Sequence, residues 1–148
     1  MGLFSFSKKA GANIFNAKSE EEIRAQKLIT LKGVVADLQL PIENLDVDLE
    51  EDRVTVYGQV ETQSNKEKIV LALGNVEGVA TVDDRISVVA PEPESRFYTV
   101  QSGDSLSKIS KEMYGDPMKY NAIFEANQPM LKSVDLIYPG QVLRIPNL

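Results

Sequence analysis

The sequence contains neither cysteine nor histidine, and these two absences exclude several kinds of chemistry. Without cysteine, the chain can form no disulfide and has no thiol nucleophile. Without either residue, the usual structural zinc, iron–sulfur and haem sites lose their ligands. A Ser-His-Asp or Cys-His catalytic arrangement is impossible for the same reason. Asp and Glu are plentiful, but no pair of them stands out as a catalytic dyad, so we do not expect an enzyme.

Long hydrophobic runs are also missing. A secretory signal needs an unbroken apolar run of about 7–15 residues, but Lys8 and Lys9 interrupt the apolar stretch that begins at Leu3. No later stretch approaches the roughly 18 apolar residues of a membrane-spanning helix. We therefore expect a cytoplasmic protein. Residues 1–18 have two interpretations: a weak amphipathic membrane contact, or a segment that packs on the first domain. With only two lysines, we expect no stable membrane association.

The charge is unevenly placed along the 148 residues. The net charge of −6 argues against nucleic acid as a partner. All of it lies before Phe97, since residues 97–148 are neutral overall. The change coincides with residues 90–96, whose two prolines favour an extended connector. We predict two domains, residues 19–89 and 97–148, joined by a short linker. Nothing in the sequence suggests a coiled coil or a large apolar surface, so we expect a monomer.

Two helices are predicted in residues 19–89. Ser19 with Glu22, and Ser64 with Glu67, have the spacing of a capping box at a helix start. Pro41 ends the first helix. Apolar residues recur at helical spacing in both: Leu28, Leu31, Val35 and Leu38 in the first, and Ile69, Leu73 and Val76 in the second.

Three strands complete this region. Leu45, Val47 and Leu49 alternate with acidic residues, and a second alternating run covers residues 54–60. A last strand contains Ala80, Val82, Ile86 and Val88. The predicted order is helix, strand, strand, helix, strand.

This order and three segments resemble a BON domain over Glu21–Val89. The segments are Val-Tyr-Gly-Gln-Val (56–60), Glu-Gly-Val-Ala-Thr-Val-Asp-Asp (77–84) and Ile-Ser-Val-Val (86–89). The last fifty residues resemble a LysM domain. Here the matching features are Tyr-Thr-Val (98–100), Gly-Asp-Ser-Leu (103–106), Asn127, Tyr-Pro-Gly-Gln (138–141) and the closing Leu-Arg-Ile-Pro (143–146). Together the two domains imply an α+β fold.

The LysM resemblance implies the order strand, helix, helix, strand. Asp104 is predicted to cap the first helix, and Asp116-Pro117 to begin the second. Pro139-Gly140 suits a type II turn before the last strand.

The LysM resemblance also implies an alternative function. LysM domains bind N-acetylglucosamine chains between two loops, which here contain Gly103, Asp104, Ser105, Leu106, Ile137 and Tyr138. Gly-Asp-Ser-Leu also reads like the motif of a hydrolase class with Ser105 as nucleophile, but no histidine is present to act as its base.

A BON domain followed by a LysM domain, without an export signal, resembles the bacterial cytoplasmic potassium-binding proteins. This resemblance implies selective binding of K⁺, with Rb⁺ or Cs⁺ as substitutes, and tightening of the two domains on binding.

A potassium site has chemical requirements that the residues can be checked against. Selective sites replace the water shell of K⁺ with uncharged carbonyl oxygens, and glycines let the backbone turn such oxygens toward one point. Two glycine-containing stretches qualify, and their candidate ligands are the carbonyls of Ser7, Ala10 and Ala12 and of Gly74, Asn75, Val76 and Gly78. The alternative for the second stretch is an ordinary helix C-cap and turn.

The acidic run Glu43–Asp52 suggests a different metal. Asp46, Asp48 and Glu50 share one strand face, but the run lacks the glycine and closing glutamate of a calcium loop. We interpret it as a solvated face.

Overall fold

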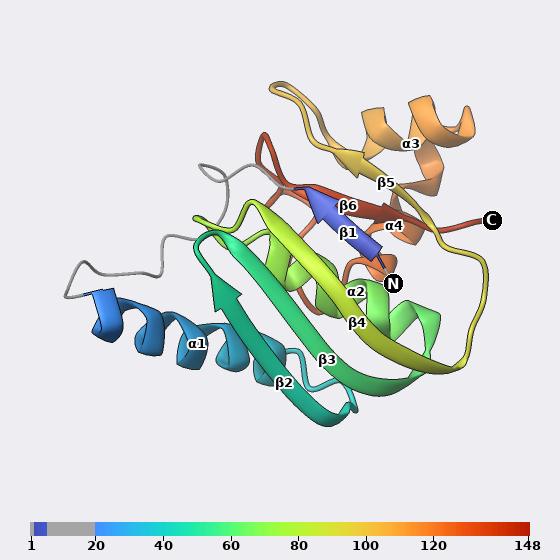
Figure 1. Cartoon of the computed structure of the whole chain (residues 1–148). Coiled ribbons are helices and arrows are strands. Elements are labelled where there is room, and N and C mark those ends of the chain that lie inside the picture. Colours follow the sequence, from blue (N-terminus) through green and yellow to red (C-terminus); the bar gives the residue numbers. More distant parts are fainter. Residues whose placement is uncertain (1, 6–19) are drawn as a thin grey trace.

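The computed structural model describes residues 2–5 and 20–148 of the chain. It has the predicted α+β fold, with two parts that each contain a sheet (Figure 1). The first part consists of β1 (Gly2–Ser5), α1 (Glu20–Asp37), β2 (Glu43–Glu50), β3 (Arg53–Thr62), α2 (Gln63–Gly74) and β4 (Thr81–Ala90). The second consists of β5 (Arg96–Thr99), α3 (Leu106–Tyr114), the short 3₁₀ helix η1 (Pro117–Lys119), α4 (Tyr120–Ala126) and β6 (Val142–Ile145).

The first sheet has the strand order β1-β4-β3-β2. Strands β3 and β4 are parallel, which requires a crossover connection, and α2 provides it. Strand β2 pairs antiparallel with β3. Strand β1 pairs antiparallel with the other edge, where Phe4 lies opposite Val82. This first strand is absent from the predicted order, which begins with a helix.

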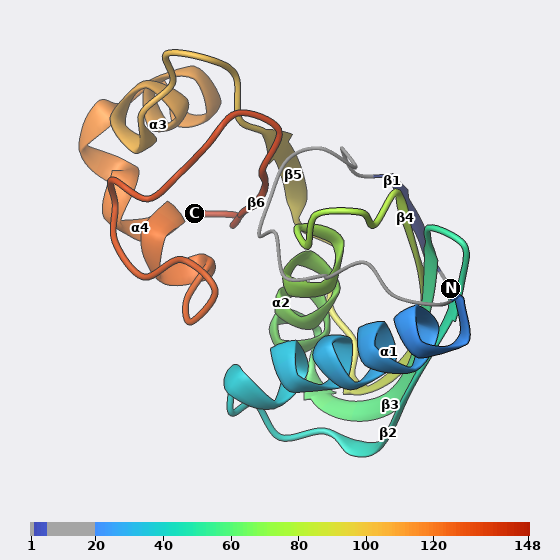
Figure 2. The same ribbon diagram turned by 90° about the vertical axis from the view of Figure 1, so that its left-hand side faces the viewer.

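Helices α1 and α2 cover one face of this sheet (Figure 2). The periodic residues of both helices enter a single core with the inward side chains of the strands, among them Leu31, Val35, Val54, Val56, Ile69, Leu73 and Val82. Burial of these alternating positions follows from the sequence periodicity.

The beginning of α2 differs from the prediction. Its N-cap is Thr62, whose hydroxyl accepts a hydrogen bond from the Asn65 amide at 3.2 Å. Ser64 lies inside the helix, and Glu67 is 2% exposed and directed to tertiary partners. The Ser64–Glu67 capping box is therefore wrong. The other predicted box depends on Ser19, which lies outside the described residues.

In the second part, β5 and β6 pair antiparallel, and α3 and α4 pack on them around Leu106, Ile109, Ile123, Leu143 and Ile145. The cap of α3 is Ser105, not Asp104, because the Ser105 side chain accepts from the Lys108 amide. Asp116 is a cap with Pro117 in the first turn, as predicted, but the element it caps is the 3₁₀ helix η1, and α4 itself begins at Tyr120. The Tyr138 carbonyl accepts from the Gln141 amide at 3.1 Å and Gly140 has φ 90°, which fits the predicted turn.

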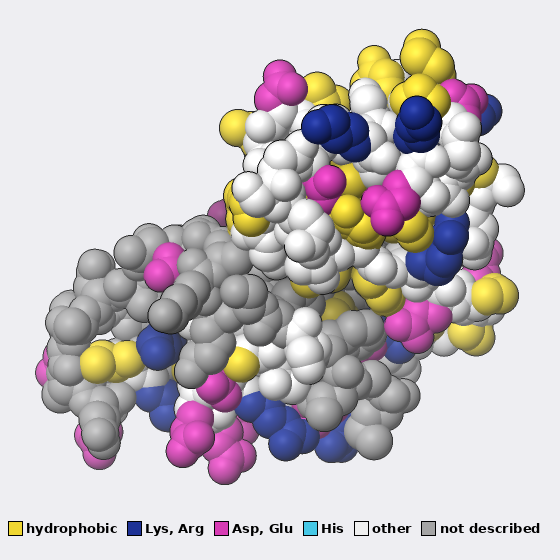
Figure 3. All heavy atoms as spheres, turned by 90° about the horizontal axis from the view of Figure 1, so that it is seen from above, with side chains coloured by type: hydrophobic (Ala, Val, Ile, Leu, Met, Phe, Trp, Pro, Cys, Tyr) yellow, Lys and Arg dark blue, Asp and Glu magenta, His cyan; other side chains and the backbone are white. Residues whose placement is uncertain are grey.

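The surface carries both signs of charge. On the face seen in Figure 3, acidic and basic side chains are interspersed, without one continuous patch of either sign. Among the described residues, no helix has the length and apolar character needed to cross a membrane.

Candidate functional site

The loop that follows α2 is the first part of the candidate site. Helix α2 ends at Gly74, and the Asn75 amide donates back to the Leu71 carbonyl at 2.9 Å. Gly78 has φ 97°, a conformation that glycine adopts without steric penalty. Asn75 and Val76 are 8% and 3% exposed. Glu77 and Gly78 are half-buried, so the loop is a turn whose first half is buried. It lies at a helix C-terminus, where carbonyl groups carry partial negative charge.

The carbonyls of this loop differ in their partners. The Val76 carbonyl accepts from the Val79 amide at 3.2 Å, and the Asn75 carbonyl accepts from the Tyr138 hydroxyl at 3.3 Å. Within the described part of the chain, no backbone amide donates to the carbonyls of Gly74 or Gly78. Gly74 is buried and Gly78 is half-buried.

The other three candidate ligands, Ser7, Ala10 and Ala12, lie outside the described residues.

The acidic side chains of the run Glu43–Asp52 do not form a metal site in the structure. Asp48 pairs with Arg24 at 2.7 Å and Asp46 with Lys32 at 3.8 Å, and all four side chains are at least half exposed. Residues 2–5 and 20–148 contain no group of three or more acidic side chains that could hold a metal ion.

The Asn75 side chain connects this loop to the second part of the molecule. Its Nδ2 donates to the Val142 carbonyl and its Oδ1 accepts from the Val142 amide, both at 2.9 Å. Tyr138, whose hydroxyl donates to the Asn75 carbonyl, is half-buried, and this burial raises the pKa of the phenol. The end of α2 thus contacts both β6 and the turn before it.

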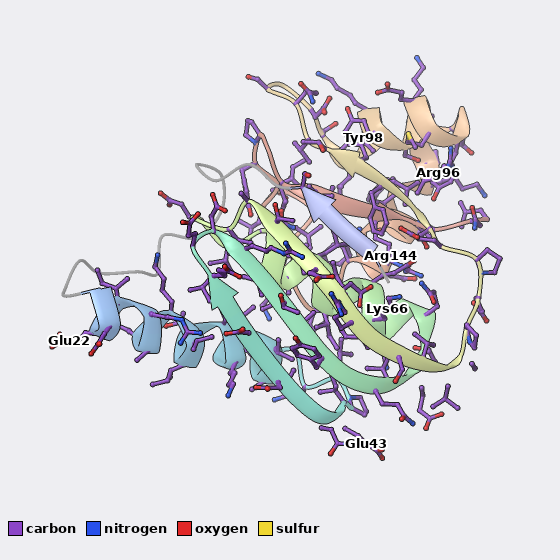
Figure 4. All side chains as sticks on the ribbon, viewed as in Figure 1. Glu22, Glu43, Lys66, Arg96, Tyr98 and Arg144 are labelled. Atoms are coloured by element: carbon purple, nitrogen blue, oxygen red, sulfur yellow. The ribbon has the colours of Figure 1, made fainter. Side chains whose placement is uncertain are left out.

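A buried ion pair forms a second connection nearer the start of α2. The Glu67 carboxylate accepts from Arg144 Nε on β6 at 2.6 Å and from the Ser95 amide at 2.9 Å. Figure 4 labels Arg144 at the boundary between the second part and α2. No sequence pattern indicates this pair, because Arg144 and Glu67 lie 77 positions apart. Burial acts to raise the pKa of Glu67, but hydrogen bonds from Arg144, Ser95 and Gln63 together lower it below 4.5.

The lowered pKa of Glu67 predicts a pH dependence of stability. A carboxylate with a depressed pKa in the folded state contributes stability that is fully present above its unfolded value of about 4.5 and is lost as the pH falls toward the folded value. Urea unfolding between pH 7 and pH 3 should therefore show a smaller loss of unfolding free energy below pH 4.5 for Glu67→Gln than for the wild type. Parallel curves would contradict this contribution of Glu67. Asp83, whose pKa is lowered by hydrogen bonds from Arg85 and Arg53, titrates in both proteins and is the internal reference.

A cavity of about 470 Å³ opens at the same boundary. The ends of α1 and α2 form one wall with Val34, Leu38 and Val76, and the segment from Pro129 to Gln141 forms the other. The two parts are therefore in contact along α2 but leave space beside the loop.

The residues of the alternative carbohydrate site are largely engaged in local structure. Asp104 accepts from the Tyr98 hydroxyl at 2.7 Å and the Gln101 amide at 2.8 Å. The hydrogen bond between Tyr98 and Asp104, together with burial, raises the pKa of Tyr98 to about 12. The Gly103 carbonyl accepts from Lys108 Nζ at 3.0 Å. Leu106 is 2% exposed, so its side chain belongs to the core. Ile137 is half-buried against that core.

Comparison with known proteins agrees with both domain resemblances. The BON domain family matches residues 30–90 and the LysM domain family matches residues 98–146. The potassium binding protein Kbp of Escherichia coli O6:H1 (strain CFT073) is 44% identical, and the alignment covers 99% of each chain. An uncharacterized protein of Deinococcus radiodurans is 33% identical over 86% of this chain, which spans about half (53%) of that relative's length. The identity over the full length of the first relative, with a BON domain and a LysM domain in this order, shows that the chain belongs to the family of the potassium binding protein Kbp.

Proposed function

We propose that this protein binds K⁺ selectively through backbone carbonyl oxygens and acts as a cytoplasmic potassium sensor or buffer, not as an enzyme. The ligands come from the loop with Gly74, Asn75, Val76 and Gly78, together with the carbonyls of Ser7, Ala10 and Ala12. The observation that supports this most directly is the pair of loop carbonyls, Gly74 and Gly78, to which no backbone amide of the described residues donates. That loop belongs to a chain whose relative is named a potassium binding protein.

Uncharged carbonyls suit a large monovalent cation. They replace the weakly held water shell of K⁺, whereas clustered carboxylates favour Ca²⁺ or Mg²⁺. The same oxygens accommodate Rb⁺ and Cs⁺, which are larger ions of equal charge. Smaller Na⁺ holds its water more strongly and binds less well at such a site.

Binding of K⁺ also tightens the contact between the two domains of a monomer. The loop is connected to β6 and Tyr138 through Asn75, and the cavity beside it leaves room for the LysM domain to move closer. An ion that fixes the loop carbonyls stabilises the docked arrangement. Small-angle scattering should record a smaller radius of gyration in KCl than in NaCl, and identical profiles would contradict this tightening.

Thermal unfolding in KCl against matched NaCl is the main test. A ligand at a hundred times its dissociation constant adds about 2.7 kcal/mol to folding stability, which raises the midpoint by several degrees. Asp46→Asn with Asp48→Asn is the matched control, because both side chains are exposed and paired with α1. Its K⁺ response should equal that of the wild type. Loss of the response in this control would assign the ion to carboxylates, and equal midpoints in the two salts would contradict K⁺ binding.

The N-terminal ligands need a separate measurement. Deletion of residues 1–18 removes Ser7, Ala10 and Ala12 but also β1, so a second variant that lacks only residues 1–5 controls for loss of the strand. Calorimetry should show weaker K⁺ binding for the longer deletion than for the shorter. Equal affinities would remove these three carbonyls from the site.

A second candidate function is binding of N-acetylglucosamine oligomers, favoured by the LysM match to residues 98–146. Stabilisation by chitin oligomers in the same thermal experiment would support it.

A further inference from the structure

Strand β6 has one edge that β5 does not cover. Along β6, Val142 and Arg144 alternate with Leu143 and Ile145, and all four have a residue of β5 opposite them. The amide and carbonyl of one strand residue point to the same side. Since the polar backbone groups of Val142 and Arg144 bond to side chains from elsewhere, they belong to the open edge.

Two asparagine side chains complete this edge in the same manner. Asn127, at the end of α4, accepts from the Arg144 amide at 2.8 Å and donates to the Arg144 carbonyl at 2.9 Å. Asn75 makes the equivalent pair with Val142, with both distances 2.9 Å. Each primary amide offers one donor and one acceptor side by side and so replaces a neighbouring strand. The first contact lies within the LysM domain, whereas the second crosses between domains.

We propose that Asn75 is the positioning residue that couples the ion-binding loop to the LysM domain: its side chain completes the edge of β6 while its main-chain oxygen belongs to the loop. This inference rests on the K⁺ site proposed above and adds the residue that transmits its occupancy. A shift of the Asn75 backbone moves the side-chain amide of Asn75 relative to Val142. An ion that fixes the loop therefore fixes the docked strand, and by reciprocity the docked strand holds the loop in its binding geometry.

The Tyr138 hydroxyl strengthens this coupling from a second direction. It donates to the Asn75 carbonyl at 3.3 Å, and a carbonyl has two lone pairs, so the same oxygen can accept this bond and contact a cation. The LysM domain therefore contacts Asn75 at both its side chain and its main chain. An apolar residue at position 75 would leave the half-buried Val142 amide and carbonyl without their Asn75 partners.

The experiment compares Asn75→Leu with Asn127→Leu. The second variant removes the equivalent pair of hydrogen bonds to Arg144, two residues further along the same edge. Leucine is used because aspartate would add charge beside a cation site. Asn75→Leu is expected to weaken K⁺ binding by at least about tenfold in calorimetry, the size expected for loss of one buried polar pair. Asn127→Leu should change it by less than about threefold while the LysM domain stays folded by NMR. Tyr138→Phe, a milder change, should give an intermediate loss.

Amide hydrogen exchange separates coupling from general stabilisation. In the wild type, K⁺ should slow exchange of the Val142 amide more than that of the Arg144 amide, and this difference should vanish in Asn75→Leu. Equal responses of the two amides, or an Asn75→Leu affinity equal to that of the wild type, would overturn the inference and leave K⁺ binding intact. Absence of K⁺ binding by the wild type would contradict the proposed function itself.

Discussion

Replacing Arg144 by methionine is expected to lower the free energy of unfolding by about 3 kcal/mol. The Arg144 side chain is 13% exposed and the Glu67 side chain 2% exposed, so water cannot take the place of the lost guanidinium. The Glu67 carboxylate would keep hydrogen bonds from Ser95 and Gln63 but would remain a buried, uncompensated charge. Because the pair joins α2 to β6, the variant should also dock its domains more weakly. Urea unfolding with one probe in each domain would measure both effects.

Two further variants test the origin of this loss. In Arg144→Met combined with Glu67→Gln, the buried charge is gone, so we expect the double variant to be more stable than Arg144→Met alone. Arg24→Met removes an exposed pair with Asp48, with both side chains more than half exposed, and should cost less than about 1 kcal/mol. Equal losses for Arg144→Met and Arg24→Met would contradict a special role for burial.

The elements that the sequence predicted correctly are those with local causes. Helices α1 and α2 and the strands from β2 to β4 follow from periodic burial of residues such as Leu31 and Val54. The turn at Gly140 and the helix start at Asp116 depend on the conformations and side chains of those residues alone. Such features need no knowledge of distant parts of the chain.

The features that the sequence did not predict depend on distant partners. Strand β1 is four residues long and exists by pairing with β4, about eighty positions later. Glu67 has capping-box spacing, but Arg144 and Ser95 attract its carboxylate instead. Ser105 caps α3 in place of Asp104, because the Asp104 carboxylate already accepts hydrogen bonds from the Tyr98 hydroxyl and the Gln101 amide. In each case a tertiary contact overrides a local preference.

The candidate site shows the same division. The position of its loop, directly after α2, follows from the glycines at 74 and 78. The Asn75 contact with Val142 could not be predicted, because an asparagine at a helix end is usually explained by local capping. Helix α2 is therefore used on two sides: Ile69 and Leu73 enter the BON core, and Glu67 and Asn75 hold the LysM domain.

Substitution of Leu73 by alanine should destabilise the protein by about 3 kcal/mol, since Leu→Ala changes at fully buried sites typically cost 2–5 kcal/mol. Leu73 is 0% exposed in the last turn of α2, and its carbonyl accepts from the Val76 amide in the candidate loop. The cavity left behind would loosen the turn that orients the loop carbonyls, so K⁺ should also stabilise this variant less than it stabilises the wild type. Ile29→Ala is the matched control, because Ile29 is 73% exposed on α1 and should change stability by less than about 0.5 kcal/mol. Thermal unfolding of both variants in KCl and NaCl would measure the two effects together. A Leu73→Ala protein with lower stability but an undiminished K⁺ response would show that the loop keeps its geometry independently of the core beneath it.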